Sequence, residues 1–285
     1  MTTTNRAACV IGWPVEHSRS PLIHNYWLKT YRIPGEYRRE AVPPDEFRAF
    51  VQSLAGRGYV GANVTVPHKE AALTISRPDD RARAVGAANT LWLDGGVLRS
   101  TNSDVEGFLN NLDACAPGWD RGSEKALVLG AGGAARAVVY ALLERGIDRV
   151  VVANRTGRRA EALHERFGDR VRPISWDERD AALNDAALVV NTTTLGMPGQ
   201  PELALDLRRL PSDAIVADLV YWPLVTPLMR AARTRQLRTA DGLGMLMHQA
   251  VRGFMLWFGT KPEVTAELRA LLEVDLAFPQ ENHQE

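Results

Sequence analysis

A glycine-rich turn between a strand and a helix constrains the fold of this chain more than any other feature of its sequence. The apolar run Leu127–Leu129 leads into Gly130-Ala131-Gly132-Gly133-Ala134-Ala135, and a second apolar run at 137–143 is long enough for a helix. In the Gly-x-Gly-x-x-Gly/Ala pattern the first glycine permits a tight turn and the second lets a pyrophosphate approach the backbone. The N–H groups that begin the helix favour phosphate. The glycines alone also fit a plain turn, but this strand–turn–helix context predicts a dinucleotide site.

The composition is typical of a soluble globular protein with about two domains. The chain has 285 residues, of which 45% are hydrophobic and 24% charged, and its formal net charge is zero. This balance, without a long run of one sign, argues against nucleic acid as the main partner. Two cysteines, Cys9 and Cys115, provide neither a disulfide framework nor a cysteine-based metal site, so we predict no metal. We see no secretory signal and no apolar run near the roughly 20 residues of a membrane span, and we expect a cytoplasmic protein.

Strands and helices alternate along the first half of the chain. Strands are expected at 7–11, 36–42 and 59–65, with helices between them, which predicts a mainly parallel sheet whose carboxyl ends carry ligand sites. A hairpin is expected further on, with its turn at Asp94-Gly95-Gly96. Two polar loops, 12–21 and 63–69, follow strands and are therefore candidates for a binding site.

Several residues in these segments have a structural as well as a functional interpretation. Ser20 fits a helix N-cap before Pro21, so Ser18 and Ser20 either cap and turn the chain or bind a carboxylate with the helix N–H groups. Lys69 after a strand fits a solvated charge, and His68 fits an exposed loop residue without a role. The local sequence favours Asp104 as a helix N-cap.

The strand expected at 149–153 gives information on the cofactor. In an NAD-binding fold an acidic residue near the end of this strand holds the ribose 2′-hydroxyl, but here Asn154-Arg155-Thr156 follows, with Arg158 and Arg159 close behind. A guanidinium forms short, charge-assisted hydrogen bonds to phosphate, so the arginines predict a 2′-phosphate and hence NADP. The alternative is a basic helix start that faces water. Two further strand ends offer Thr192, Thr193 and Tyr221 near the expected nicotinamide, although such hydroxyls often bind only backbone.

Four sequence signatures together resemble the shikimate dehydrogenase family over nearly the full length of the chain. They are Gly-x-Pro-x-x-His-Ser-x-Ser-Pro-x-x-His-Asn at Gly12–Asn25, Asn-Val-Thr-x-Pro-x-Lys at Asn63–Lys69, Gly-Ala-x-Asn-Thr at Gly86–Thr90 and Gly-x-Gly-Met-Leu-x-x-Gln at Gly242–Gln249. The chain departs from the family at Trp13, which is bulkier than expected, and at Ser103 and Val105, where the family usually has Thr and Gly in Asn-Thr-Asp-Gly.

The resemblance implies a two-domain α/β fold and a reaction. An N-terminal substrate domain would cover 1–105 and 246–285, and a Rossmann-type, doubly wound NADP domain 106–245. The reaction would be reversible, NADPH-dependent reduction of 3-dehydroshikimate to shikimate, by a monomer or homodimer with no nucleic-acid or membrane partner. The alternatives are a quinate or aminoshikimate dehydrogenase of the same family, and a non-catalytic NADP-binding sensor.

The resemblance, together with the glycine turn and the polar strand ends described above, assigns the site residues. Lys69 and Asp104 are expected as the catalytic pair. The expected substrate ligands are Ser18, Ser20, Asn63, Thr65, Asn89, Tyr221 and Gln249, although a Met and aromatic stripe like that around Gln249 is otherwise typical of a helix packed in a core. The expected cofactor-binding residues are Gly130, Ala131, Gly132, Gly133, Ala134, Asn154, Arg155, Thr156, Arg159, Thr192, Thr193, Gly242 and Met245.

Overall fold

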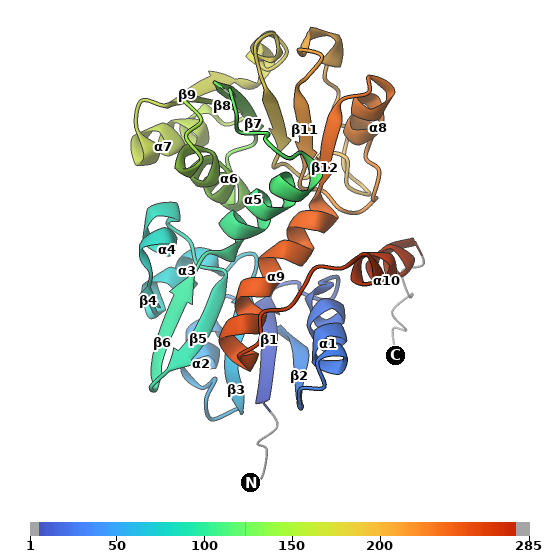
Figure 1. Ribbon diagram of the computed structural model, residues 1–285. Coiled ribbons are helices and arrows are strands. Elements are labelled where there is room, and N and C mark those ends of the chain that lie inside the picture. Colours follow the sequence, from blue (N-terminus) through green and yellow to red (C-terminus); the bar gives the residue numbers. More distant parts are fainter. Residues whose placement is uncertain (1–5, 123, 278–285) are drawn as a thin grey trace. The chain divides into compact units, whose positions relative to one another are not determined.

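The computed structural model describes residues 6–122 and 124–277, and it confirms the expected α/β class (Figure 1). The chain divides into two compact units. The first unit ends at Ser103 and resumes over Leu246–Val274, and the second covers Asp104–Met245 and begins again at Asp275. The expected division at 105 and 246 stays a prediction about domains, and its last segment, 278–285, lies outside the described residues.

The first unit contains a six-stranded mixed sheet in the order β2-β1-β3-β5-β6-β4. Its strands are β1 (Arg6–Gly12), β2 (Gly35–Ala41), β3 (Tyr59–Val64), β4 (Arg77–Pro78), β5 (Thr90–Asp94) and β6 (Val97–Thr101). Strand β1 pairs in parallel with β2 and β3, whereas β5 runs antiparallel to both β3 and β6. The expected hairpin is confirmed, because Gly95 and Gly96 connect β5 to β6. The antiparallel pairing of β5 with β3 places the start of β5 beside the carboxyl end of β3.

Helices cover this sheet through two groups of apolar side chains. The helices are α1 (Ser20–Thr30), α2 (Phe47–Gln52), α3 (Lys69–Ile75), α4 (Asp80–Val85) and the later part of α9 (Gly242–Phe258), followed by α10 (Ala266–Ala277). Phe47, Val51 and Leu54 pack in one core cluster with β1 and β3. The second group consists of aromatic side chains. One of them, Trp257 of α9, donates a 2.8 Å hydrogen bond to the backbone oxygen of Leu91. Helix α9 is thereby fixed to the strand that begins at Thr90.

The second unit contains a six-stranded parallel sheet in the order β12-β11-β10-β7-β8-β9. Its strands are β7 (Lys125–Leu129), β8 (Arg149–Asn154), β9 (Val171–Ser175), β10 (Leu188–Asn191), β11 (Ile215–Asp218) and β12 (Arg238–Asp241). Numbered from β7, this is the order 3-2-1-4-5-6 read in reverse, the doubly wound dinucleotide-binding order. The order reverses between β7 and β10, and the crevice at such a point is where ligands bind in these sheets.

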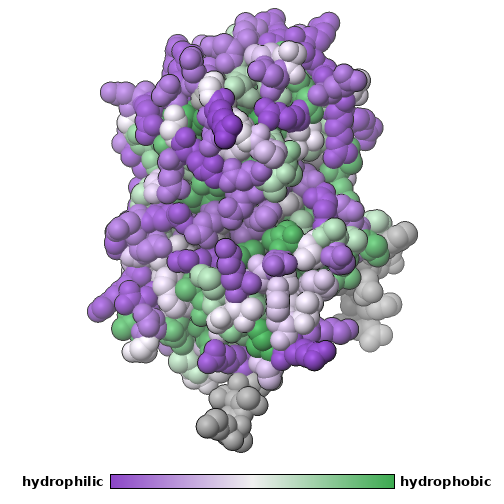
Figure 2. All heavy atoms as spheres, in the orientation of Figure 1, coloured by the Kyte–Doolittle hydropathy of each residue, from purple (hydrophilic) through white to green (hydrophobic). Residues whose placement is uncertain are grey.

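One helix of the second unit precedes its first strand, and three others connect its parallel strands. They are α5 (Ser103–Cys115), α6 (Gly133–Glu144), α7 (Gly157–Phe167) and α8 (Pro227–Thr234), and three short 3₁₀ turns also occur. Strands β7, β8, β10 and β11 are buried along nearly their whole length, because helices cover both faces of such a sheet. Strands β9 and β12 lie at the two edges and are more polar. Hydrophilic residues occupy much of the face drawn in Figure 2.

Candidate functional site

The loop after β1 leads to the start of α1, where Ser18 and Ser20 are predicted to bind the carboxylate of a substrate. Ser20 is buried and is the first helical residue, so the expectation that Ser20 is the N-cap is wrong. Arg19 occupies that position with helix-like dihedral angles, and the helix therefore begins one residue earlier than predicted. The Ser18 hydroxyl accepts a 3.3 Å hydrogen bond from the Ser20 N–H, so Ser18 partly caps this end. The Arg39 guanidinium donates to the Ser18 carbonyl at 2.8 and 3.0 Å and holds the loop against β2.

Asn63 lies at the carboxyl end of β3, and both ends of its side-chain amide are bound within the protein. Its oxygen accepts a 2.7 Å hydrogen bond from the Tyr37 hydroxyl. Its nitrogen donates to the Thr90 hydroxyl at 3.2 Å and to the backbone oxygen of Asn89 at 3.3 Å. Because the side chain is only 5% exposed, Asn63 connects β2, β3 and β5 in a buried polar cluster.

Thr65, His68 and Lys69 follow β3 and lead into α3. Thr65 and Lys69 are half-buried, and Lys69 is the first residue of α3. His68, expected to be exposed, is buried instead: its ring stacks on Phe47 at 4.3 Å, and its Nε2 lies 2.8 Å from the Val42 oxygen. The expectation was wrong because a tertiary contact with α2, invisible in the local sequence, covers the imidazole. Burial lowers the pKa of His68.

Asn89 and Ser103 form the centre of the polar cluster. The Asn89 side-chain oxygen accepts from the Ser103 N–H at 2.7 Å, from the Ser103 hydroxyl at 3.2 Å and from the Thr90 hydroxyl at 3.1 Å. The Ser103 hydroxyl lies 3.5 Å from the side-chain oxygen of Gln249, whose amide nitrogen donates to the Leu246 carbonyl at 3.1 Å. The structure therefore brings three predicted substrate ligands, Asn63, Asn89 and Gln249, into one hydrogen-bonded cluster.

Asp104 is buried and is the second residue of α5, which begins at Ser103. The interpretation of Asp104 as an N-cap is therefore wrong, since a cap precedes the first helical residue. Asn102, the residue before the helix, instead uses its side chain to donate a 2.9 Å hydrogen bond to the Ala87 carbonyl. A carboxylate in the first turn still interacts favourably with the helix dipole. The pairing of Asp104 with Lys69 stays a prediction.

In the second unit, the glycine turn lies between β7 and α6 as expected. Gly130 has a φ of +101°, and a Cβ added there would lie 2.7 Å from the Thr192 hydroxyl oxygen, so neither the conformation nor the space suits another residue. Gly132 occupies the N-cap of α6, and nothing lies within 4 Å of a Cβ added at Gly132 or Gly133. This open N-terminus can accept a phosphate on its backbone N–H groups. Ala131 and Ala134 are half-buried beside these glycines.

The predicted 2′-phosphate residues follow β8, next to β7 in the sheet. Strand β8 ends at Asn154, whose side-chain nitrogen donates a 2.9 Å hydrogen bond to the Thr156 carbonyl and so closes a tight turn. Arg155 and Arg159 are exposed, and Thr156 is the N-cap of α7. The end of β8 thus presents guanidinium groups and an amide where an NAD-specific sheet presents an acid.

The other predicted cofactor residues lie at the ends of β10 and β12. Thr192 donates its hydroxyl to the Leu129 carbonyl at 2.7 Å, and Thr193 donates to the Asn191 side-chain oxygen at 2.7 Å, so both hydroxyls bind protein groups. Gly242 is the first residue of α9, and Met245 is buried in its first turn.

Asp218, which sequence reasoning missed, organises the loop that leads to Tyr221. Its buried carboxylate accepts from the Asn191 side chain at 2.9 Å, the Val220 N–H at 3.0 Å and the Thr226 hydroxyl at 2.6 Å. Burial raises the pKa of Asp218, and these three donors oppose part of the rise. Tyr221, three residues later, is half-buried. The signal for Asp218 was its position at the end of an otherwise apolar strand.

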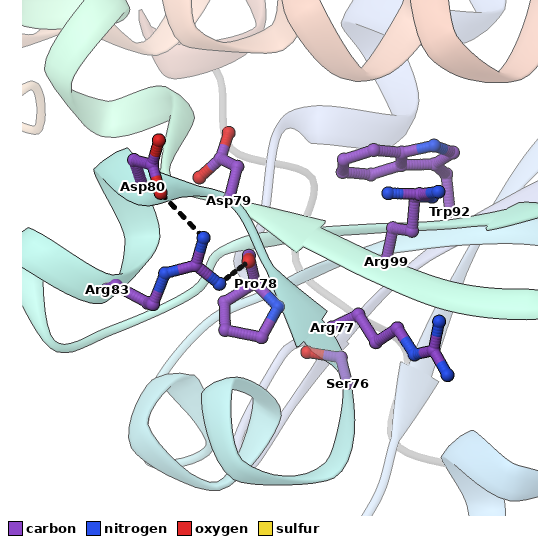
Figure 3. Close-up of a pocket in the computed structure, with 8 residues that line it drawn as sticks. All are labelled: Ser76, Arg77, Pro78, Asp79, Asp80, Arg83, Trp92 and Arg99. Carbon is purple, nitrogen blue, oxygen red and sulfur yellow. Dashed lines mark hydrogen bonds and ion pairs between the residues drawn. The ribbon is translucent and has the colours of Figure 1, made fainter.

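A surface pocket of about 540 Å³ in the first unit contains none of the predicted site residues (Figure 3). Two of its arginines pair with carboxylates, Arg83 with Asp80 at 2.6 Å and Arg99 with Asp94 at 2.8 Å. We assign no ligand to it. The lining residues are Ser76, Arg77, Pro78, Asp79, Asp80, Arg83, Trp92 and Arg99.

Comparison with known proteins identifies the family. The shikimate dehydrogenase substrate-binding domain family matches residues 10–91, and the shikimate/quinate 5-dehydrogenase family matches residues 118–198. A shikimate dehydrogenase (NADP⁺) of Rhodopseudomonas palustris strain HaA2 is 68% identical over 95% of this chain and 96% of the relative. The chain belongs to the shikimate dehydrogenase family.

Solved structures of this family share the fold. The Thermus thermophilus shikimate 5-dehydrogenase, in complex with NADP(H) and shikimate, is 36% identical, with a TM-score of 0.82 over 96% of this chain and 98% of the other. The Corynebacterium glutamicum quinate dehydrogenase, in complex with NAD, is 30% identical, with a TM-score of 0.87 over 94% and 98%. Among the described residues, no helix is long and apolar enough to span a membrane.

The family signatures led to Asn63, Asn89 and Gln249 but left the residues that hold them without a role. Tyr37, Thr90 and Ser103 supply the hydroxyl groups that join these amides. The sequence signal for Thr90 and Ser103 is that each neighbours an assigned residue. The signal for Tyr37 is that it is the one aromatic residue of a polar strand. Two residues have larger side chains than the family pattern predicts at their positions. Val105 is fully buried in α5, whereas Trp13 is 48% exposed.

Proposed function

We propose that the protein catalyses the reversible, NADPH-dependent reduction of 3-dehydroshikimate to shikimate. The observation that carries this proposal is the 68% identity to a relative named shikimate dehydrogenase (NADP⁺) over nearly the whole length of both chains. Lys69, Asp104 and the predicted substrate ligands are all present in this chain. We also propose that the enzyme is cytoplasmic. It works as a monomer or a homodimer, and light scattering after size-exclusion chromatography would distinguish these two states.

The substrate side of the reaction uses anion and hydroxyl binding. Ser18 and Ser20 hold the substrate carboxylate at the start of α1, where hydroxyl and backbone N–H donors converge. The amides of Asn63, Asn89 and Gln249, together with Thr65, provide polar groups for the ring hydroxyls. Because the amides are already fixed by protein hydrogen bonds, they lose little freedom when substrate binds.

The residues of the second unit fit NADP. The exposed N-terminus of α6, with open space at Gly132 and Gly133, suits the pyrophosphate, and Arg155 with Arg159 suits the 2′-phosphate. Bound NADPH supplies the hydride for the keto carbon of the substrate.

Lys69 and Asp104 handle the proton. Reduction of the ketone turns its oxygen into an alkoxide that needs a proton, and the Lys69 ammonium supplies it, while oxidation of the alcohol returns the same proton. In this proposal the carboxylate of Asp104 orients the lysine. Together the two side chains act as one acid–base unit.

A direct assay tests the proposal. NADPH oxidation followed at 340 nm with 3-dehydroshikimate should give turnover, and NADP⁺ reduction with shikimate should give the reverse reaction. Parallel assays discriminate the related dehydrogenases. In them, quinate or an aminoshikimate replaces shikimate, and NADH replaces NADPH. A chain that binds NADP⁺ in calorimetry but turns over none of these acids would be the non-catalytic sensor.

A further inference from the structure

Thr90 lies between two amides that the proposed function assigns to substrate binding. It is the first residue of β5, and its side chain is fully buried. Its hydroxyl oxygen accepts a 3.2 Å hydrogen bond from the Asn63 amide nitrogen and donates a 3.1 Å hydrogen bond to the Asn89 amide oxygen. A threonine hydroxyl has one proton to donate and lone pairs to accept, so Thr90 can make both bonds at once.

The surrounding donors fix the direction of each bond. A backbone N–H can only donate, so the atom of Asn89 that lies 2.7 Å from the Ser103 N–H must be the amide oxygen. The atom of Asn63 that lies 3.3 Å from the Asn89 carbonyl must be the amide nitrogen, because two oxygens would repel each other there. Thr90 therefore has a nitrogen donor on one side and an oxygen acceptor on the other, and the order of its two bonds cannot reverse.

The Ser103 hydroxyl extends this arrangement toward Gln249. It lies 3.0 Å from the Thr90 hydroxyl and 3.5 Å from the Gln249 amide oxygen. While Thr90 donates to Asn89, the single proton of Ser103 can serve Asn89, Gln249 or the Thr90 oxygen. Without the Thr90 hydroxyl, Asn63 would lose an acceptor and the Asn89 oxygen a donor in a region with little access to water.

We propose that Thr90 is a positioning residue for substrate binding: its hydroxyl, bound to both side-chain amides, helps to hold Asn63 and Asn89 in the orientation in which they bind a cyclic polyhydroxy acid. The inference rests on the proposed function. Thr90 itself is assigned no contact with substrate, so its effect must pass through the two amides.

Two substitutions separate the hydroxyl from the packing of the side chain. Thr90→Val keeps the shape and removes the hydroxyl, and Thr90→Ser keeps the hydroxyl and removes a methyl group. Loss of one buried hydrogen-bonding group should raise the KM for shikimate about five- to twentyfold in Thr90→Val. Thr90→Ser should stay within about threefold of wild type. The KM for NADP⁺, whose predicted ligands lie in the second unit, should stay within about twofold in both variants.

A double-mutant cycle tests whether Thr90 acts through Asn89. In an Asn89→Ala background, Thr90→Val should raise the KM for shikimate by a clearly smaller factor than in wild type, because only Asn63 is then left for the Thr90 hydroxyl to hold. Equal effects in both backgrounds would overturn the proposal, as would a Thr90→Ser enzyme that is as impaired as Thr90→Val. If Thr90→Val does not fold, Thr90→Ala enters the same cycle with the same expectations. Wild-type protein that reduces no 3-dehydroshikimate would instead overturn the proposed function, and shikimate binding by calorimetry would then replace KM in the cycle.

Discussion

The hydroxyl of Tyr37 donates a 2.7 Å hydrogen bond to the side-chain oxygen of Asn63, and both side chains are buried. This bond crosses from β2 to β3, although β1 lies between these two strands in the sheet. Burial raises the pKa of Tyr37, and its interactions with Asn63 and Ser20 oppose part of the rise, so the phenol remains a donor. Tyr37 thereby links Ser20, the first residue of α1, to the polar cluster around Asn89.

Removal of the Tyr37 hydroxyl should destabilise the protein. In Tyr37→Phe the buried Asn63 oxygen loses this donor, so we expect a loss of about 1–3 kcal/mol in the free energy of unfolding. Urea denaturation followed by tryptophan fluorescence measures it. Tyr26→Phe, on the half-buried side of α1, is the matched control and should change the same free energy by less than about 0.5 kcal/mol. Similar losses in the two variants would contradict the prediction.

The ring of His24 makes stability depend on pH. His24 is fully buried and stacks on Tyr37 at 4.1 Å, and burial lowers its pKa from 6.5 to about 3. The unfolded chain binds a proton at this histidine below about pH 6.5, whereas the folded protein does so only near pH 3, so stability rises with pH across that window and is lost as pH falls. The slope approaches about 1.4 kcal/mol per pH unit.

We expect His24→Phe to reduce this dependence. Between pH 7 and pH 4.5, wild type should lose about 2–3 kcal/mol more in the free energy of unfolding than the variant does. Urea denaturation at a series of pH values measures the difference. His24→Leu also lacks a titrating ring and should show the same pH difference, whatever its stability at pH 7. Parallel curves for wild type and both variants would show that His24 is not the group responsible.

Arg155 should determine the choice of cofactor. A charge-assisted hydrogen bond to phosphate contributes about 1.5–3 kcal/mol, so Arg155→Ala should raise the KM for NADP⁺ about 10- to 100-fold and leave the KM for NAD⁺ nearly unchanged. Steady-state kinetics with each cofactor measures both constants. Arg166→Ala removes a positive charge from the last turn of α7, the helix that follows Arg155, and serves as the control. Equal damage with both cofactors would rule out a specific contact with the 2′-phosphate.

Local patterns predicted the parts of the fold that local sequence determines. The turn at Gly130 follows from a glycine that must adopt a positive φ, and the hairpin follows from two adjacent glycines between β5 and β6. Strands β9 and β12 were not predicted, because edge strands such as Arg238–Asp241 are polar and form only when a neighbouring strand is present.

The errors at the candidate site have two causes, the exact start of a helix and contacts between residues far apart in the chain. The local sequence predicts N-caps at Ser20 and Asp104, but each lies inside its helix, because a preceding residue can also occupy the helix N-terminus. His68 was expected to be exposed and is covered by Phe47. The roles of the site residues came from the family resemblance, and the hydroxyls that fix them come from contacts between residues as distant in the chain as Ser103 and Gln249. Such contacts leave no periodic signal in the sequence.

Lys69 and Asp104 should act as one unit in catalysis. Lys69 begins α3 and Asp104 lies in the first turn of α5, so each is held on a helix rather than on a flexible loop. General acid–base groups typically contribute about 10²–10⁴ in rate, so Lys69→Ala should lower kcat at least about a hundredfold. The KM for shikimate should change little, because the carboxylate and hydroxyl ligands remain.

Asp104→Asn should lower kcat to a comparable extent, since the lysine loses the charge that orients it. The double variant should then be little worse than either single variant, because a disabled pair has nothing further to lose. Stopped-flow single turnovers at 340 nm measure the chemical step without product release. Glu70→Gln, an exposed neighbour of Lys69 in the first turn of α3, is the control and should keep nearly wild-type kcat. A Lys69→Ala enzyme with near-normal kcat would exclude the lysine as the proton donor, and fully multiplicative losses in the double variant would show that the two residues act independently.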